Sequence, residues 1–301
     1  MIINKIIEKI QIVNGIHGLI ISSYNNYEET SFHGGFYYLE ISHMFEEITL
    51  SNKYHYHNLL SVMMLGAWIY FGIKGSRLKN QEIKRKISIW IILGCLIQEI
   101  MDFMNRIFLD PNYIFSIQRD LPFLQFCQIS FYFSLLCMFF TRKKINENKK
   151  YSRNQFLFDG AFLLGFSGAF QGIITPEFVN INNIMGVICI QLQHSLIILN
   201  LVWLMFAYDY RLKFKGVCLT YLLINLIAPF ALFLNNLLGT NSAGDPANYF
   251  YVNELPKVDN VLLNFVSQHP SPDYILYIQP VFIIYFLLLY APFALLNKIK
   301  K

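Results

Sequence analysis

Seven long apolar stretches alternate with shorter polar segments along the chain. Each stretch is near the ~20 residues that an α-helix needs to cross the hydrocarbon core of a bilayer. We therefore predict an all-α, polytopic membrane protein with seven transmembrane helices, at residues 58–75, 87–108, 121–141, 156–178, 184–208, 214–238 and 274–296. They form one seven-helix domain, residues 57–301, which an N-terminal segment, residues 1–56, precedes.

Basic residues gather in every second gap between these stretches. Most of the 24 Lys and Arg residues lie in the loops at 74–86, 142–153 and 209–216 and in the C-terminal tail. Short cytoplasmic loops carry an excess of Lys and Arg. The charge pattern therefore predicts an N-terminus outside, a cytoplasmic C-terminus and a multi-pass protein of the cell membrane.

Three segments on the outer side have a pattern of their own. In residues 1–22, isoleucines at helical spacing alternate with polar residues, which predicts an amphipathic helix on the membrane surface rather than a cleavable signal peptide. Residues 33–47 predict a second short surface helix. The longest gap, 239–273, predicts a partly ordered lid in which Asp259 caps a short helix.

The composition narrows the class of protein. The chain is 55% hydrophobic and 14% charged, whereas soluble domains carry about 25% charged residues. The net charge of +5 comes from short loops, so we expect no nucleic-acid partner. The five cysteines lie inside predicted spans without metal-ligand spacing, and His55 and His57 lack carboxylate or thiol companions. We therefore predict no disulfide framework, no metal and no cofactor.

Polar residues recur at one depth inside the predicted spans. Such groups are costly in hydrocarbon and need a partner or a purpose. Counted from the predicted topology, the outer halves contain Glu99, Asp102, Gln125, Cys127, Gln128, Gln171, Gln191, His194, Asn235, Asn236 and Gln279. This predicts a polar cavity open to the outer leaflet. The alternative is that these side chains only join helices through hydrogen bonds.

Cys127 and His194 are the candidate catalytic pair. A nucleophilic cysteine needs a base, and the base needs an orienting partner. His194 is the one histidine inside a predicted span, and Glu99 or Asp102 could orient it. We assign substrate binding to the amides and one phenol on the same side, namely Gln125, Gln128, Gln171, Gln191, Asn235, Asn236, Asn248, Tyr249 and Gln279.

Several ordered landmarks resemble the bacterial YwaF-like proteins and their eukaryotic relative, transmembrane protein 164. They are LPFLQFCQI (121–129), GFSGAFQGIITPEF (165–178), QLQHSLII (191–198), ANYFYVNELP (247–256) and PSPDYILY (271–278). The resemblance covers residues 58–296 and implies acyl transfer between lipids, with Cys127 and His194 at the functional positions. Gln125 departs from the family pattern, which often has a histidine there.

Two classes of function follow from these features. The first is an acyltransferase or transacylase that moves a fatty acyl chain from a membrane phospholipid, through a thioester on Cys127, to a lysophospholipid or an exported lipoprotein. The second is a non-enzymatic carrier or receptor with a polar outer pocket for a lipid or small molecule. A purely structural membrane protein is a third reading. Substitution of Cys127 separates the first from the others.

Overall fold

Every regular element in the described part of the chain is helical. The structure, a computed structural model, describes residues 44, 46–110, 112–113, 115–121, 124–141, 151–178, 180–242, 244–258 and 261–299. The long helices are α3 (Leu50–Arg77), α4 (Gln81–Met104), α5 (Phe126–Phe140), α6 (Arg153–Ser167), α8 (Ile184–Ala207), α9 (Phe214–Leu238) and α12 (Gln279–Ile299). The shorter elements are a π-helical turn η1 (Asn105–Leu109), α7 (Ala169–Ile174), a 3₁₀ turn η2 (Tyr249–Tyr251), α10 (Val261–Asn264) and α11 (Tyr274–Tyr277). The all-α prediction is confirmed.

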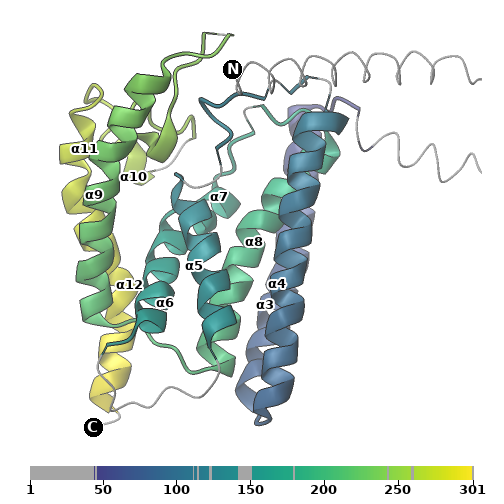
Figure 1. Ribbon diagram of the computed structural model, residues 1–301, viewed down its shortest axis with the longest axis vertical. Helices are drawn as coiled ribbons and strands as arrows, with labels where there is room; N and C mark the ends of the chain where they lie inside the picture. The colour runs from purple at the N-terminus through teal and green to yellow at the C-terminus, as the bar shows by residue number, and fades with distance from the viewer. Residues whose placement is uncertain are drawn as a thin grey trace, which may run out of the picture.

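The helices form a bundle with α6 and α8 at its centre. Figure 1 shows α3 and α4 on one side, α9 and α12 on the other, and α5 to α8 between them. Small residues let α3 approach α8 closely, because a Cβ on Gly75 would lie 3.1 Å from the backbone nitrogen of Ala207. The indole N–H of Trp68 also donates to the carbonyl of Ser195 at 2.9 Å. The central helices are therefore the most buried.

The outer helices expose large apolar side chains. Val62 on α3 is 70% exposed, Trp90 on α4 is 72% exposed and Leu226 on α9 is 64% exposed. Apolar faces of this extent are stable in contact with lipid rather than water. Six helices in the described residues are long and apolar enough to cross a membrane. The chain is therefore a multi-pass membrane protein.

The third predicted span differs from the other six. The sequence pattern covers 121–141, but the helix begins at Phe126 and has only 15 residues. Pro122 disfavours helical backbone at the residue before it, and Gln125 is extended, with φ −121° and ψ 150°. Among the long apolar helices of the described residues, α5 alone is too short for a full span and has no neighbouring helix to extend it, as α7 extends α6.

The fourth predicted span, 156–178, is a broken helix. Its backbone leaves helical geometry at Gly168, between α6 and α7, and the helix ends at Ile174 rather than at Phe178. The first helix also begins earlier than predicted, at Leu50, within the segment assigned to the N-terminal region. The hydroxyl of Thr49 accepts a hydrogen bond from the N–H of Asn52 and caps the helix, so the helix begins eight residues before the predicted span.

The predicted outer segments are described only in part. The amphipathic helix of 1–22 lies outside the described residues. Of the surface helix expected at 33–47, Glu47 instead forms an antiparallel bridge with Asn183. In the lid, α10 confirms a short helix after Asp259, although Asp259 itself lies outside the described residues.

The two ends of the bundle differ in charge. The turn between α3 and α4 carries Arg77 and Lys79, the turn between α8 and α9 carries Arg211 and Lys213, and both lie at the end where the chain terminates (Figure 1). The opposite end contains the end of α4, the start of α5, α7, the start of α8 and the segment after α9. The predicted polar residues gather at this second end.

Candidate functional site

A pocket of about 590 Å³ opens at the end of the bundle opposite the basic turns. Its walls come from α4, α5, α7, α8, α9 and α12 and from the segment 245–258. Among the predicted site residues, those that line it are Asp102, Gln125, Cys127, Gln128, Gln171, His194, Asn248 and Gln279. The predicted polar cavity is therefore present, and it contains both members of the candidate catalytic pair.

Cys127 lies in the first turn of α5. The first N–H groups of a helix have no acceptor within the helix and favour negative charge nearby. The extended Gln125 precedes the helix without capping it through its side chain. Cys127 is therefore closer to unpaired backbone donors than a cysteine in the middle of an apolar helix would be.

Two glycines on one face of the broken helix bring Cys127 and His194 together. A Cβ on Gly168 would lie 2.9 Å from the backbone nitrogen of Cys127. A Cβ on Gly172 would lie 2.6 Å from Cε1 of His194. Residues four apart on a helix lie one above the other on the same face. Cys127 and His194 thus pack against Gly168, which precedes α7, and Gly172 in α7, and both line one pocket.

His194 has no acidic partner in this arrangement. Its Nδ1 is buried and makes no hydrogen bond with the described residues. Glu99 accepts a hydrogen bond from Gln193 at 2.9 Å, and Asp102 pairs with Arg106 at 2.5 Å. The expectation that either carboxylate orients His194 does not agree with these contacts. Gly172 and the surrounding packing hold the imidazole instead.

The amides of the pocket leave acceptors open. Gln125 donates to the carbonyl of Asn248 at 3.4 Å, and Gln279 donates to the carbonyl of Ile275 at 2.8 Å. The side-chain oxygens of both glutamines are buried and have no partner in the described structure. Since buried polar groups are normally hydrogen-bonded, these oxygens are natural contact points for a bound ligand.

Several predicted binding residues lie away from the pocket. Gln191 donates to the hydroxyl of Ser61 at 2.6 Å, and Asn236 is exposed at the end of α9. The side-chain amide of Asn235 accepts from the backbone N–H of Tyr249 at 2.9 Å and donates to the backbone carbonyl of Tyr249 at 3.1 Å. Gln191, Glu99 and Asn235 therefore join elements of the bundle through hydrogen bonds, as the alternative reading of the polar residues expects.

An ion-pair network that the sequence did not predict closes one side of the pocket. Arg106 contacts Asp102 at 2.5 Å and Asp120 at 3.7 Å, and Arg119 contacts Asp120 at 3.3 Å. The phenol of Tyr113 donates to Asp120. Burial raises the pKa of Tyr113 to about 12, so the phenol stays protonated as a donor. The Asp102–Arg106 spacing of four residues is the signal that could have revealed this pair.

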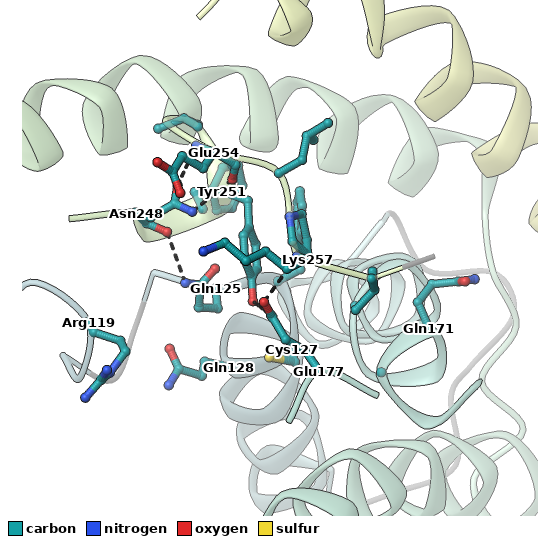
Figure 2. A pocket seen from close by; sticks show the side chains of 18 of the residues that line it. Arg119, Gln125, Cys127, Gln128, Gln171, Glu177, Asn248, Tyr251, Glu254 and Lys257 are labelled. Atoms are coloured by element: carbon teal, nitrogen blue, oxygen red, sulfur yellow. Dashed lines mark hydrogen bonds between the residues drawn. The ribbon is translucent and has the colours of Figure 1, made fainter. Parts of the chain in front are cut away.

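Residues 247–258, which we call the strap, cross the pocket on its other side. The side chain of Asn248 caps the strap by accepting from the N–H groups of Asn253 and Glu254, at 3.1 and 3.0 Å. Glu177, which follows α7, accepts from the phenol of Tyr251 and the backbone N–H of Lys257, both at 3.2 Å. Figure 2 shows Tyr251, Glu177 and Cys127 meeting beneath the strap. The strap, which lies within the predicted lid, is therefore an internally bonded part of the pocket wall.

A model of the TMEM164 family matches residues 49–290, a range that includes every residue lining the pocket. The chain belongs to the TMEM164 family. The resemblance inferred from the ordered motifs is thus confirmed. No curated protein and no solved structure matches this TMEM164 family member.

In this TMEM164 family protein, Tyr249 anchors the strap. Its side chain is fully buried, and its hydroxyl donates to the carbonyl of Ile117 at 2.7 Å and accepts from the N–H of Leu121 at 2.8 Å. Burial raises the pKa of Tyr249 to about 12, so its hydroxyl stays protonated and can donate this hydrogen bond. Tyr249 was predicted to bind substrate, but these contacts join the strap to the chain before α5.

Replacing Tyr249 with phenylalanine is expected to destabilise the protein by about 1 kcal/mol, because two partly buried backbone groups lose their partner. Thermal unfolding in detergent, with proteolysis of the strap, measures the effect. Tyr277→Phe is the control, because Tyr277 is 51% exposed. Equal unfolding temperatures for the two variants would contradict the anchoring role.

Proposed function

We propose that the protein is a membrane-embedded acyltransferase that moves a fatty acyl chain from a phospholipid to a lipid or lipoprotein acceptor through a thioester on Cys127. The observation that carries the proposal is that Cys127 and His194 line one pocket and pack against Gly168 and Gly172, four residues apart. A thiol at a helix N-terminus and an imidazole with an unpartnered nitrogen, in one pocket, are the elements of nucleophilic acyl transfer.

The chemistry has two halves. In the first, Cys127 Sγ attacks the ester carbonyl while a ring nitrogen of His194 takes the thiol proton. The C–S bond forms, the ester C–O bond breaks, and His194 returns the proton to the leaving glycerol oxygen. In the second half, a hydroxyl or amine attacks the thioester and gives its proton to His194. The C–S bond then breaks, and the departing sulfur recovers that proton.

The proposed topology decides which acyl donor reaches the pocket. We infer seven spans, with the shorter α5 among them, an outer N-terminus and a cytoplasmic C-terminus in the cell membrane. The positive-inside rule supports this orientation, since the basic turns share one end of the bundle. The pocket then faces the outer leaflet, away from cytosolic acyl-CoA. A phospholipid is the donor in this topology, and a lysophospholipid or an exported lipoprotein is the acceptor.

The test is covalent labelling of the purified protein in lipid with a phospholipid that carries an alkyne-tagged fatty acyl chain. We expect a hydroxylamine-sensitive label in the wild type, none in Cys127→Ala and little in His194→Ala. Cys218→Ala is the matched control, because Cys218 is exposed on α9 and does not line the pocket. A label that persists in Cys127→Ala would remove this thiol from the mechanism.

The open amide oxygens of Gln125 and Gln279 support a second candidate, a non-enzymatic carrier or receptor for a lipid or small molecule. Such a protein needs the pocket but not the thiol. Retained phospholipid binding in both wild type and Cys127→Ala, with no thioester in either, would favour this function.

A further inference from the structure

The strap brings a second reactive side chain to Cys127, the phenol of Tyr251. The hydroxyl of Tyr251 donates to Glu177, and Figure 2 shows this pair next to the sulfur of Cys127. All three side chains line the pocket. The two half-reactions described above use the thiol and an imidazole but assign nothing to this phenol.

The backbone of the strap is strained where it presents Tyr251. Phe250 and Tyr251 both have left-handed φ angles, of 62° and 51°. Residues other than glycine rarely adopt this region, so the backbone here is strained. The phenol of Tyr274 donates to the carbonyl of Tyr251, and the hydroxyl of Ser271 donates to that of Val252 at 3.2 Å. These bonds hold the phenol in place before any substrate binds.

The hydrogen bond from Tyr251 to Glu177 is a weak one. Its length is 3.2 Å, whereas O–H···O bonds in proteins are usually about 2.5–3.0 Å. A hydroxyl rotates to suit a better acceptor. Burial raises the pKa of Tyr251, and the nearby Glu177 and Cys127 act in the same direction. The phenol therefore remains a neutral donor rather than becoming a phenolate.

We propose that Tyr251 donates a hydrogen bond to the oxyanion that forms when Cys127 attacks an ester carbonyl. The role rests on the proposed acyl transfer. As the C–S bond forms, the carbonyl π electrons move onto the oxygen, which becomes a stronger acceptor than the neutral ester. The phenol turns from Glu177 to this oxygen. The electrons return when the ester C–O bond breaks, and Tyr251 keeps its proton throughout.

The competing explanation is mechanical. Tyr251 could serve only to tie the strap to Glu177, in which case either partner of the bond would be equally important. The oxyanion role instead requires the hydroxyl and tolerates a change in the carboxylate. Glu177→Gln keeps an amide oxygen that can accept from Tyr251 and from the N–H of Lys257, while it removes the charge. This pair of variants therefore separates the two explanations.

The experiment is a single-turnover measurement of Cys127 acylation by the alkyne-tagged phospholipid, with the full-length protein in detergent–lipid micelles. Tyr251→Phe is expected to slow acylation about 100-fold, the usual effect of removing one oxyanion donor. Binding of a dialkyl ether phospholipid, which has no carbonyl to attack, should stay within about twofold of the wild type. Glu177→Gln should acylate within about fivefold of the wild type.

Each other outcome rejects the proposal. Acylation of Tyr251→Phe within about threefold of the wild type would show that the phenol is dispensable. If Glu177→Gln slowed acylation as much as Tyr251→Phe, the bond between Tyr251 and Glu177 would serve only to hold the strap. If the wild type forms the thioester and Tyr251→Phe forms it at an unchanged rate, only the role of Tyr251 is overturned. Absence of any thioester in the wild type overturns both this role and the proposed acyl transfer.

Discussion

Gly172→Ala is expected to slow acyl transfer on the order of a thousandfold, close to the loss from removing a general base, while the protein remains folded. The new Cβ would lie 2.6 Å from Cε1 and 2.8 Å from Nδ1 of His194, too close for either atom. Because the imidazole is the movable end of a side chain, it moves away and the backbone of α7 does not. A misplacement of about 1 Å is enough to impair a reacting group.

The control for this prediction is a second helical glycine, one that no side chain packs against. A Cβ on Gly66 in α3 would meet nothing within 4 Å, so Gly66→Ala should be fully active. Alanine is favoured over glycine in a helix by about 1 kcal/mol, so neither variant should lower the unfolding temperature. Transfer rates in phospholipid micelles measure the outcome. Similar rates for the two variants would show that His194 takes no part at this position.

Arg106→Met is expected to destabilise the fold by about 3–5 kcal/mol, the usual result of removing one partner of a buried ion pair. Methionine keeps most of the side-chain volume but leaves Asp102 without its guanidinium partner, while Asp120 keeps Arg119. The side chain of Asp120 is only 1% exposed and that of Asp102 is 11% exposed. Little water therefore reaches these carboxylates to replace the guanidinium of Arg106. The thermal unfolding midpoint in detergent measures the loss.

An exposed ion pair provides the comparison. Lys86 contacts Glu82 at 2.9 Å, but their side chains are 68% and 73% exposed. Lys86→Met should therefore change stability by less than about 1 kcal/mol. If Arg106→Met unfolded at the same temperature as Lys86→Met, the network beside the pocket would be a surface feature rather than a structural one.

The helices and the shared pocket could be predicted because both follow from the hydropathy of short segments and from the position of each residue along its span. Hydropathy locates a span within a few residues, and counting along the predicted spans placed Cys127 and His194 at one depth. The contacts of the acids could not be derived in this way. Glu99 meets Gln193, a residue far away in the chain, and no pattern in either helix shows which faces meet.

The long-range contacts of the strap escaped prediction for the same reason. Asn235 and Tyr249 are polar residues near a predicted cavity, yet they bond to each other and to the chain before α5. Gly168 and Gly172 were visible as glycines one helical turn apart. What each glycine makes room for becomes evident only when α5 and α8 are placed against α7.

The shortness of α5 has a consequence for the surrounding lipid. Its 15 residues rise about 22 Å, less than the ~30 Å hydrocarbon thickness. On the seven-span topology that we propose, the residues before the helix, among them the extended Gln125, complete the crossing. Backbone of this kind is tolerated at membrane depth only where protein buries it or water reaches it. The bilayer beside Cys127 is then locally thin and wet, so a lipid ester can meet the thiol without its acyl chains leaving the membrane.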